Sequence, residues 1–162
     1  MNKDEALRFL ALHQPLPPDS ALSAELLEAY DEVRKFFLEH PDPDCIRPLL
    51  NSFGEGSGHG VYQLIENVIR KLPTRNVVTE LMHSLRSEHR SVRYWNAQIA
   101  ALFPVNALLP MLSKLLHEDD FDMRYAALTA LEKIGPDAKP IVAEFLVTER
   151  DPELRSLAEG IL

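Results

Sequence analysis

Apolar residues recur along this chain at spacings of three and four, which is the period of an amphipathic helix. The stretch 91–104 carries one such pattern, and similar patterns follow at thirty-one-residue intervals, at 123–131 and at 154–158. A more divergent copy precedes them at 61–73. Self-similarity at a fixed period of this size predicts an array of two-helix units that bury their apolar faces against one another.

The same periodicity predicts where the helices begin and end. Prolines within 15–18 and 41–43 forbid helix and separate the first three helices. Asp120 and Asp151 stand where a side-chain oxygen can cap a helix, and Pro152 stands at a favoured first helical position. The expected helices cover residues 3–13, about 20–40, 45–53, 60–72, 75–87, 91–103, 106–117, 121–134, 137–148 and 152–161.

These elements predict the fold class and the domain organisation. No segment alternates apolar and polar residues for long enough to compete as a strand. We therefore expect an all-α fold, a right-handed α–α superhelix. It is expected to be a single domain over 1–162, with N-terminal capping helices in 1–40 and the repeats in 41–162.

Two copies of the repeat carry its motif most clearly. They read Asp-Pro-Glu-Leu-Arg-Ser-Leu-Ala at 151–158 and Met-Arg-Tyr-Ala-Ala-Leu-Thr-Ala-Leu-Glu-Lys-Ile-Gly at 123–135. On these residues, the segment 41–162 resembles HEAT-like repeats of the short bacterial type, related to phycobilisome-lyase repeats. The resemblance implies a helical solenoid, but such repeats serve many unrelated functions. Bilin attachment would follow from the lyase kinship alone, and no residue here supports it.

Composition is ordinary for a globular protein, with 46% hydrophobic and 26% charged residues in a chain of 162. No apolar run approaches the roughly 20 residues that a membrane span needs. Residues 1–5 lack the layout of a secretory signal. The lone Cys45 can form no internal disulfide and is expected to pack as a small hydrophobic side chain. Together these features predict a cytoplasmic protein without membrane attachment.

Charge is unevenly distributed along the chain. The net charge is −8, yet the segment 70–93 carries six bases against two acids. A mostly acidic surface repels nucleic-acid phosphates and membrane surfaces and attracts a basic partner. The basic segment 70–93 nevertheless leaves nucleic-acid binding, of the kind found in DNA-repair proteins with helical repeats, as the alternative function.

Motifs for catalysis or metal binding are missing from the sequence. The six histidines include no His-Glu-x-x-His motif, and a single cysteine offers no pair for a zinc site. Serine, histidine and aspartate are present without the spacing of a nucleophile elbow. We therefore expect no enzyme activity, no metal and no cofactor.

Protein contacts are expected on the outward positions of the second helix of each pair and on the tyrosines that follow the repeated arginines. The candidate contact residues are His83, Arg86, Arg90, Arg93, Tyr94, Met111, Lys114 and Tyr125. Thr79 and Glu144 are further outward positions of the same helices.

The loop 54–60 holds four of the six glycines. It lacks the lysine of a phosphate-binding loop, so nucleotide binding is not expected. The loop is either a mobile connection between helix pairs or a second partner-binding segment. For the second alternative the candidates are Glu55, His59 and Tyr62.

Arg93, Arg124 and Arg155 recur at the same position of successive repeats. Each is expected to bridge to an acid of a neighbouring repeat, and a ladder that binds a ligand is the alternative. Asn96 occupies a position that is apolar in the other copies, so its amide must find a hydrogen-bond partner or lower stability.

These observations favour a non-enzymatic protein-interaction module that binds its partner on a concave face. Small acidic proteins with this repeat resemble immunity proteins that neutralise bacterial toxins, so a basic toxin domain is one expected partner. The chain is expected to be a monomer or a weak homodimer. Pairing end to end would cover the apolar residues Leu154, Leu157, Ile161 and Leu162.

Overall fold

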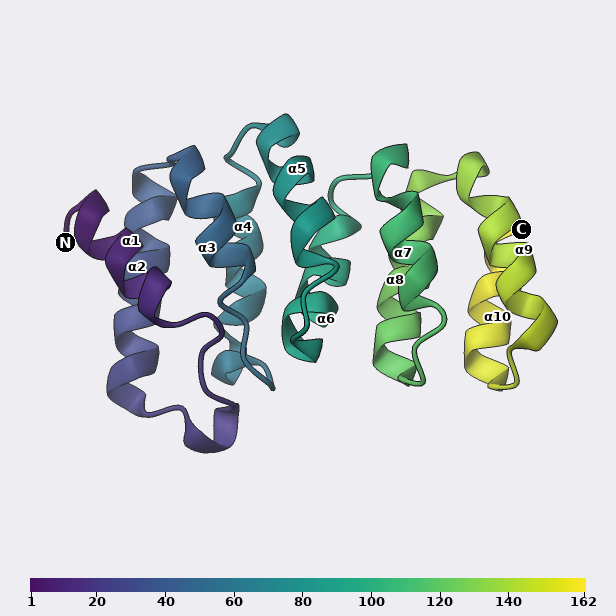
Figure 1. Cartoon of the computed structure of the whole chain (residues 1–162), viewed down its shortest axis with the longest axis horizontal. Helices are drawn as coiled ribbons and strands as arrows, with labels where there is room; N and C mark the ends of the chain where they lie inside the picture. The colour runs from purple at the N-terminus through teal and green to yellow at the C-terminus, as the bar shows by residue number, and fades with distance from the viewer. The chain divides into compact units, whose positions relative to one another are not determined.

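The computed structural model describes residues 1–162 and is helical throughout, without a strand (Figure 1). Its backbone divides into two compact units, residues 1–95 and 96–162. The boundary falls inside one helix, α6 (Arg90–Ala100). The all-α prediction is confirmed, and the repeated helix pairs are those of an α-solenoid. The right-handed sense of the superhelix and the single-domain organisation stay predictions.

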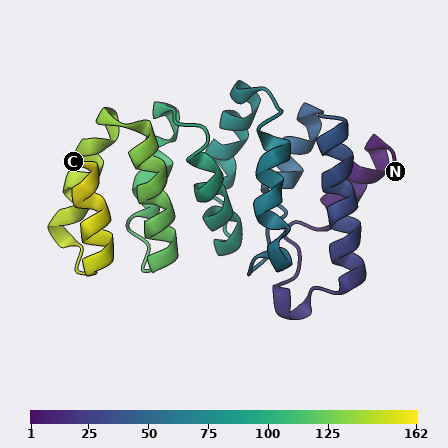
Figure 2. The ribbon, with the colours of Figure 1, turned by 180° about the vertical axis from the view of Figure 1, so that it is seen from behind.

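The first unit contains five complete helices. They are α1 (Lys3–Leu12), α2 (Ala24–Glu39), α3 (Ile46–Leu50), α4 (Ile65–Ile69) and α5 (Thr74–Ser84). Within this unit α3 packs against α5, α2 packs against α4, and α1 contacts both α2 and α3. Figure 1 views the unit from the side of α3 and α5, and Figure 2 views it from the side of α2 and α4. The two layers enclose a core of large apolar side chains such as Phe37, Ile65 and Leu81.

The second unit contains the end of α6 and four further helices. They are α7 (Leu109–Leu115), α8 (Phe121–Ile134), α9 (Lys139–Thr148) and α10 (Pro152–Ile161). Here α8 packs against both α7 and α10, and α10 packs against α9. The expected helix caps are confirmed, because the Asp120 side chain accepts from the Met123 amide and the Asp151 side chain accepts from the Leu154 amide. Pro152 occupies the first turn of α10 as expected.

The predicted helices are confirmed, with one systematic difference. The bounds predicted for α8 and α10 agree with the structure at both ends. Several other helices are shorter and begin with a separate 3₁₀ turn, as at 62–64, 106–108 and 136–138. The segment predicted as helix over 60–72 is the clearest case, since only 65–69 is α-helical.

The glycine-rich loop 54–60 is held by the segment that connects α1 to α2. The Asp19 carboxylate accepts hydrogen bonds from the backbone amides of Ser57 and Gly58, both at 2.9 Å. In return, the Asp19 amide donates to the Glu55 carbonyl at 2.9 Å. A Cβ atom on Gly54 would collide with the Leu16 carbonyl, so only glycine permits this approach. The loop is therefore bonded to the fold through its backbone.

A cluster of four aromatic rings lies beneath this loop. Tyr62 is in edge contact with Tyr30, Phe53 and Trp95, and the rings of Phe53 and Trp95 are stacked with centroids 5.7 Å apart. The Tyr62 hydroxyl accepts from the Gly54 amide at 3.0 Å, and the Trp95 indole donates to the Gly56 carbonyl at 3.0 Å. Tyr62 and Trp95 therefore satisfy loop backbone groups that are without a helical partner, whereas the Tyr30 hydroxyl is hydrogen-bonded to the Ser52 hydroxyl.

Cys45 and Asn96 are both buried, as predicted from the sequence. Cys45 is fully buried, and its burial raises the pKa of the thiol to about 12, so it packs as a small hydrophobic side chain. Asn96 is fully buried, as expected for its core position in the repeat.

We predict that Asp19→Asn lowers the free energy of unfolding by about 1–3 kcal/mol at neutral pH, because it removes the charge that accepts two loop amides. Partial burial works to raise the pKa of Asp19, but the Ser57 and Gly58 amides outweigh it and hold the pKa below its ordinary value of 3.8. The stabilisation is therefore present above pH 3.8 and is lost as the pH falls through the lowered pKa.

Urea unfolding of both proteins at several pH values measures this difference. Glu28→Gln, at an exposed position of α2, is the matched control and should change stability by less than about 0.5 kcal/mol. A difference between wild type and Asp19→Asn that is the same at pH 7 and well below pH 3.8 would contradict the assignment.

Candidate protein interface

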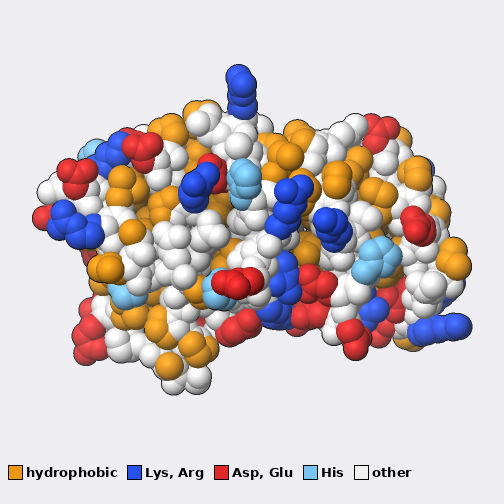
Figure 3. Space-filling view, in the orientation of Figure 1, with side chains coloured by type: hydrophobic (Ala, Val, Ile, Leu, Met, Phe, Trp, Pro, Cys, Tyr) orange, Lys and Arg blue, Asp and Glu red, His pale blue; other side chains and the backbone are white.

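The exposed side of α5 forms a stripe of polar residues in the first unit. Arg75, Thr79 and His83 are exposed and follow one another at intervals of four residues, so they lie on one side of the helix. Arg86 is exposed just beyond the end of α5. Figure 3, in the orientation of Figure 1, shows basic side chains gathered over α3 and α5. We call this side of the first unit the α3/α5 face.

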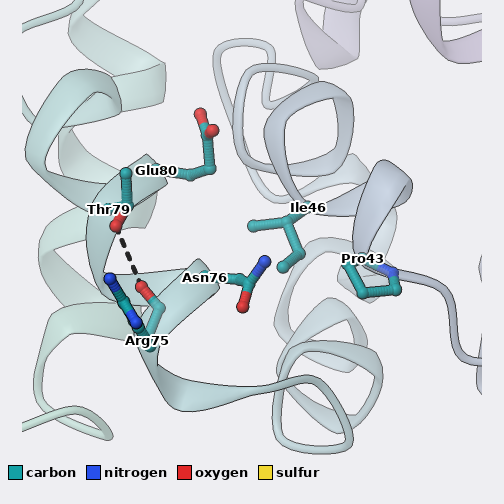
Figure 4. A pocket seen from close by; sticks show the side chains of 6 residues that line it. All are labelled: Pro43, Ile46, Arg75, Asn76, Thr79 and Glu80. Carbon is teal, nitrogen blue, oxygen red and sulfur yellow. Dashed lines mark hydrogen bonds between the residues drawn. The ribbon is translucent and has the colours of Figure 1, made fainter.

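A hollow of about 380 Å³ opens on the α3/α5 face. It is lined by Pro43, Ile46, Arg75, Asn76, Thr79 and Glu80. Figure 4 shows the side chain of Asn76 pointing from α5 toward Ile46, with Pro43 beyond it. The Thr79 hydroxyl donates to the Arg75 carbonyl at 3.0 Å, which leaves its oxygen lone pairs free to accept. The hollow thus combines an apolar wall from α3 with polar groups from α5.

The charges around this hollow are only partly neutralised. Glu80 is bound by the Arg47 guanidinium through two contacts, 2.8 Å and 3.3 Å long. Asp42 and Asp44, on either side of Pro43, both bind Lys3. Arg75 and Asn76 have no side-chain partner within the protein. The carboxylates near the hollow are therefore paired, while a guanidinium and an amide that line it are not.

The opposite side of the first unit has the opposite charge. The helix α2 carries five acids and two bases, and both bases are bound to acids of the same helix. A second hollow of about 360 Å³ opens there beside Leu27 and Val61, with Glu28 at its edge. The acidic surface expected to attract a basic partner is therefore not on the α3/α5 face of this unit.

Comparison with known protein families decides the classification. The family model for HEAT repeats matches residues 78–162, which is just over half of the chain. The chain belongs to the HEAT repeat family. None of the curated proteins that were compared matches the chain significantly. HEAT repeats stack helix pairs into extended binding surfaces, commonly mediate protein–protein interaction and are typically non-enzymatic scaffolds.

Six of the candidate contact residues of this HEAT protein are exposed. They are His83, Arg86, Lys114, Tyr125, Glu55 and His59. Arg90, Arg93 and Tyr94 are half-buried, and the guanidinium of Arg90 lies over the Tyr94 ring, 5.2 Å from its centroid. On α8 the Tyr125 ring lies beside Phe121, which is also exposed. The structure therefore leaves most of the candidate side chains accessible to a partner.

Two candidates are buried, and predicting them as exposed was wrong. Tyr62 belongs to the aromatic cluster, and its hydroxyl is bound to the Gly54 amide. Met111 is 2% exposed on α7. Leu108, Met111, Leu112 and Leu115 follow the i, i+3, i+4, i+7 spacing that places residues on one side of a helix. Met111 consequently faces the core together with Leu112.

Arg75, Asn76 and Arg47 were missed as candidates. The periodicity would have been sufficient for Arg75, because it lies one helical turn before the outward position Thr79. Asn76 and Arg47 could not be found in this way, since their place depends on how α3 packs against α5. Leu154, expected to be covered by a second copy of the chain, is instead buried within its own unit.

The basic segment 70–93 has much of its charge engaged within the protein. Lys71 donates to the Leu38 carbonyl, Arg90 pairs with Glu55, and Arg93 donates to the carbonyls of Ser87 and Glu88. These three of the six bases serve the fold, which weakens the case for nucleic-acid binding because that binding depends on cations free to contact phosphates.

Each of the three repeated arginines binds a turn. Arg93 and Arg155 bind the turn before their own helix, and Arg124 binds the turn between α9 and α10. Arg93 and Arg155 each donate to the carbonyl six residues earlier, Ser87 and Glu149 respectively, at 2.9 Å. Arg124 binds the Glu149 carboxylate at 2.7 Å. The expected bridge to an acid of a neighbouring repeat is confirmed for Arg124, and Arg155 pairs with Glu159 of its own helix.

Glu149 is the centre of the best-connected polar group in the second unit. Its carboxylate is 3% exposed and accepts from Arg124 and from the backbone amides of Arg150 and Asp151. The Nε atom of Arg124 is buried without a hydrogen-bond partner, beside a hollow of about 220 Å³ that has room for water. These contacts fix the turn between α9 and α10.

Neither a metal site nor a membrane span is found in the structure. No three side chains among histidine, cysteine, aspartate and glutamate lie close enough together to hold a metal ion. None of the helices combines the length and the hydropathy required to cross a bilayer.

We predict that Arg124→Ala lowers the free energy of unfolding by about 2–4 kcal/mol, because it leaves the buried Glu149 carboxylate without its cation. Arg150→Ala is the matched control, since Arg150 is exposed, and its cost should stay below about 0.5 kcal/mol. Thermal and urea unfolding measure both. Equal costs for the two variants would show that the Arg124–Glu149 pair is unimportant for stability.

Proposed function

We propose that this HEAT repeat protein is a non-enzymatic scaffold that binds another protein through the α3/α5 face of its first unit. The observation that carries the proposal is the hollow on that face, where the exposed Arg75 and Asn76 have no partner within the protein. A lone, buried thiol suits a reducing compartment, so we place the encounter in the cytoplasm.

Three physical arguments support this surface. A concave site with an apolar wall and a few polar groups is a usual anchor point for a partner side chain. Arginine is enriched among the residues that contribute most to binding energy in protein interfaces. The stripe of Arg75, Thr79 and His83 extends the contact along two turns of α5 without disturbing buried residues.

Thr79→Trp is expected to abolish binding of the partner, because its bulky uncharged side chain would fill the hollow and occupy the middle of the α5 stripe. Asn67→Trp places the same side chain on the exposed surface of α4 and should leave binding unchanged. The measurement is affinity capture from the native host with quantitative mass spectrometry, comparing wild type with both variants.

The expected result is a protein that wild type and Asn67→Trp retain and that Thr79→Trp loses. A partner retained equally by all three proteins would overturn the α3/α5 face as the contact surface. Circular dichroism and thermal unfolding verify that both variants are folded.

A second candidate partner is a basic protein, of which a toxin domain neutralised by an immunity protein is one case. The specific observation concerns two turns of the second unit, residues 117–122 and 149–153, which contain six acids besides the buried Glu149 against one arginine. Asp119 and Glu153 are exposed members of this group. Such a surface would speed the approach of a cationic domain and mask its phosphate-binding groove.

Reversing both charges, Asp119→Lys with Glu153→Lys, should weaken capture of a basic partner by about tenfold at low salt and by less at high salt. Asp4→Lys, on the exposed side of α1 in the first unit, is the control and should leave capture unchanged. A captured protein that is acidic, or whose retention is independent of salt, would rule out this candidate.

A further inference from the structure

We propose that the hollow on the α3/α5 face binds an acidic side chain of the protein partner, with Arg75 as its charge partner. The inference rests on the proposed function and adds the chemistry of the partner at that site. It is an inference about a protein segment that carries aspartate or glutamate, and about neither a free anion nor a nucleic acid.

The lining of the hollow offers more hydrogen-bond donors than acceptors. The exposed guanidinium of Arg75 and the amide nitrogen of Asn76 can donate, and no side chain of the protein accepts from either. The carboxylate of Glu80 would compete for Arg75, but two hydrogen bonds hold it to Arg47. The group that this lining lacks is therefore a carboxylate from outside the chain.

The charges that surround the hollow are close to balance, so the positive charge available at it is that of Arg75. Arg47 is exposed on the same face but is paired with Glu80, and Arg86 is exposed just beyond the end of α5. The nearby acids Asp42 and Asp44 share the single cation Lys3, at 2.7 Å each, so one negative charge of this group remains. The first turn of α5 begins after Pro73 without a side-chain cap, and its partial positive charge also favours an anion.

The shape of the hollow distinguishes a carboxylate side chain from a phosphate. Pro43 and Ile46 form an apolar wall, against which the methylene groups of glutamate or of a neighbouring residue can pack. A phosphate is usually bound by several cations, whereas Arg47 is occupied by Glu80 and only Arg75 is unpaired in the lining. We therefore assign the site to an acidic protein segment.

The test uses the full chain labelled with ¹⁵N and three probes: a synthetic peptide alternating glutamate and alanine, the matched glutamine–alanine peptide, and inorganic phosphate. The glutamate peptide should shift the amide resonances of the first two turns of α5 in a saturable manner. Arg75→Glu should weaken its binding by at least about tenfold, because an attraction becomes a repulsion. Arg8→Glu, on the exposed surface of α1, should leave it unchanged.

Equal binding of the glutamate and glutamine peptides would overturn the inference, and so would saturable binding of phosphate at the same amides with comparable affinity. Capture of the native partner separates this failure from failure of the proposed function. Release by Thr79→Trp together with full retention by Arg75→Glu would support the α3/α5 face as the contact surface and refute binding of an acidic side chain there. Retention by both variants would refute the α3/α5 face as the contact surface.

Discussion

Backbone groups that lie outside helices must still find hydrogen-bond partners, and the first unit depends on how this is achieved at residues 54–60. Asp19 supplies an acceptor for two amides, Tyr62 accepts a third, and Trp95 donates to a carbonyl. These side chains come from three different parts of the chain, so the loop joins the connection after α1 to the start of α6. The short helices α3 and α4 on either side of the loop are positioned by these contacts rather than by their own length.

The first unit also separates its charges between two layers. On α2 the two bases, Arg34 and Lys35, are bound to acids of the same helix, and the remaining carboxylates face solvent. On the α3/α5 face the acid Glu80 is the group that is neutralised, and cations face solvent. A net charge of −8 therefore describes neither surface, and a partner will experience the local pattern rather than the total.

Much of the fold could be predicted from the sequence because the hydrophobic period reports burial directly. The bounds of α8 and α10 and the caps Asp120 and Asp151 follow from local rules, and the structure agrees with them. Met111 obeys the same period, since it lies three residues after Leu108 and four before Leu115, so its burial was predictable and its choice as an outward position was wrong. The role of Asp19 depends on contacts between residues nearly forty positions apart, for which a single sequence contains no local signal.

The candidate interface, like the fold, could be predicted only in part from the sequence. Thr79 and His83 were found from helical spacing, whereas the pairing of Arg47 with Glu80, which leaves Arg75 unpaired, spans thirty-three residues and requires the packing of α3 on α5. Outward positions are thus predictable, while the charge that remains available on them is a property of the tertiary structure.

Cys45 lies next in sequence to Ile46, in the wall of the hollow, yet its thiol is sealed inside the first unit. With one sulfhydryl in the whole chain, alkylating reagents have a single target, and the native protein keeps it protonated and out of their reach. The rate of Cys45 alkylation therefore measures how often α3 opens transiently. A bound partner that holds this helix in place would lower that rate.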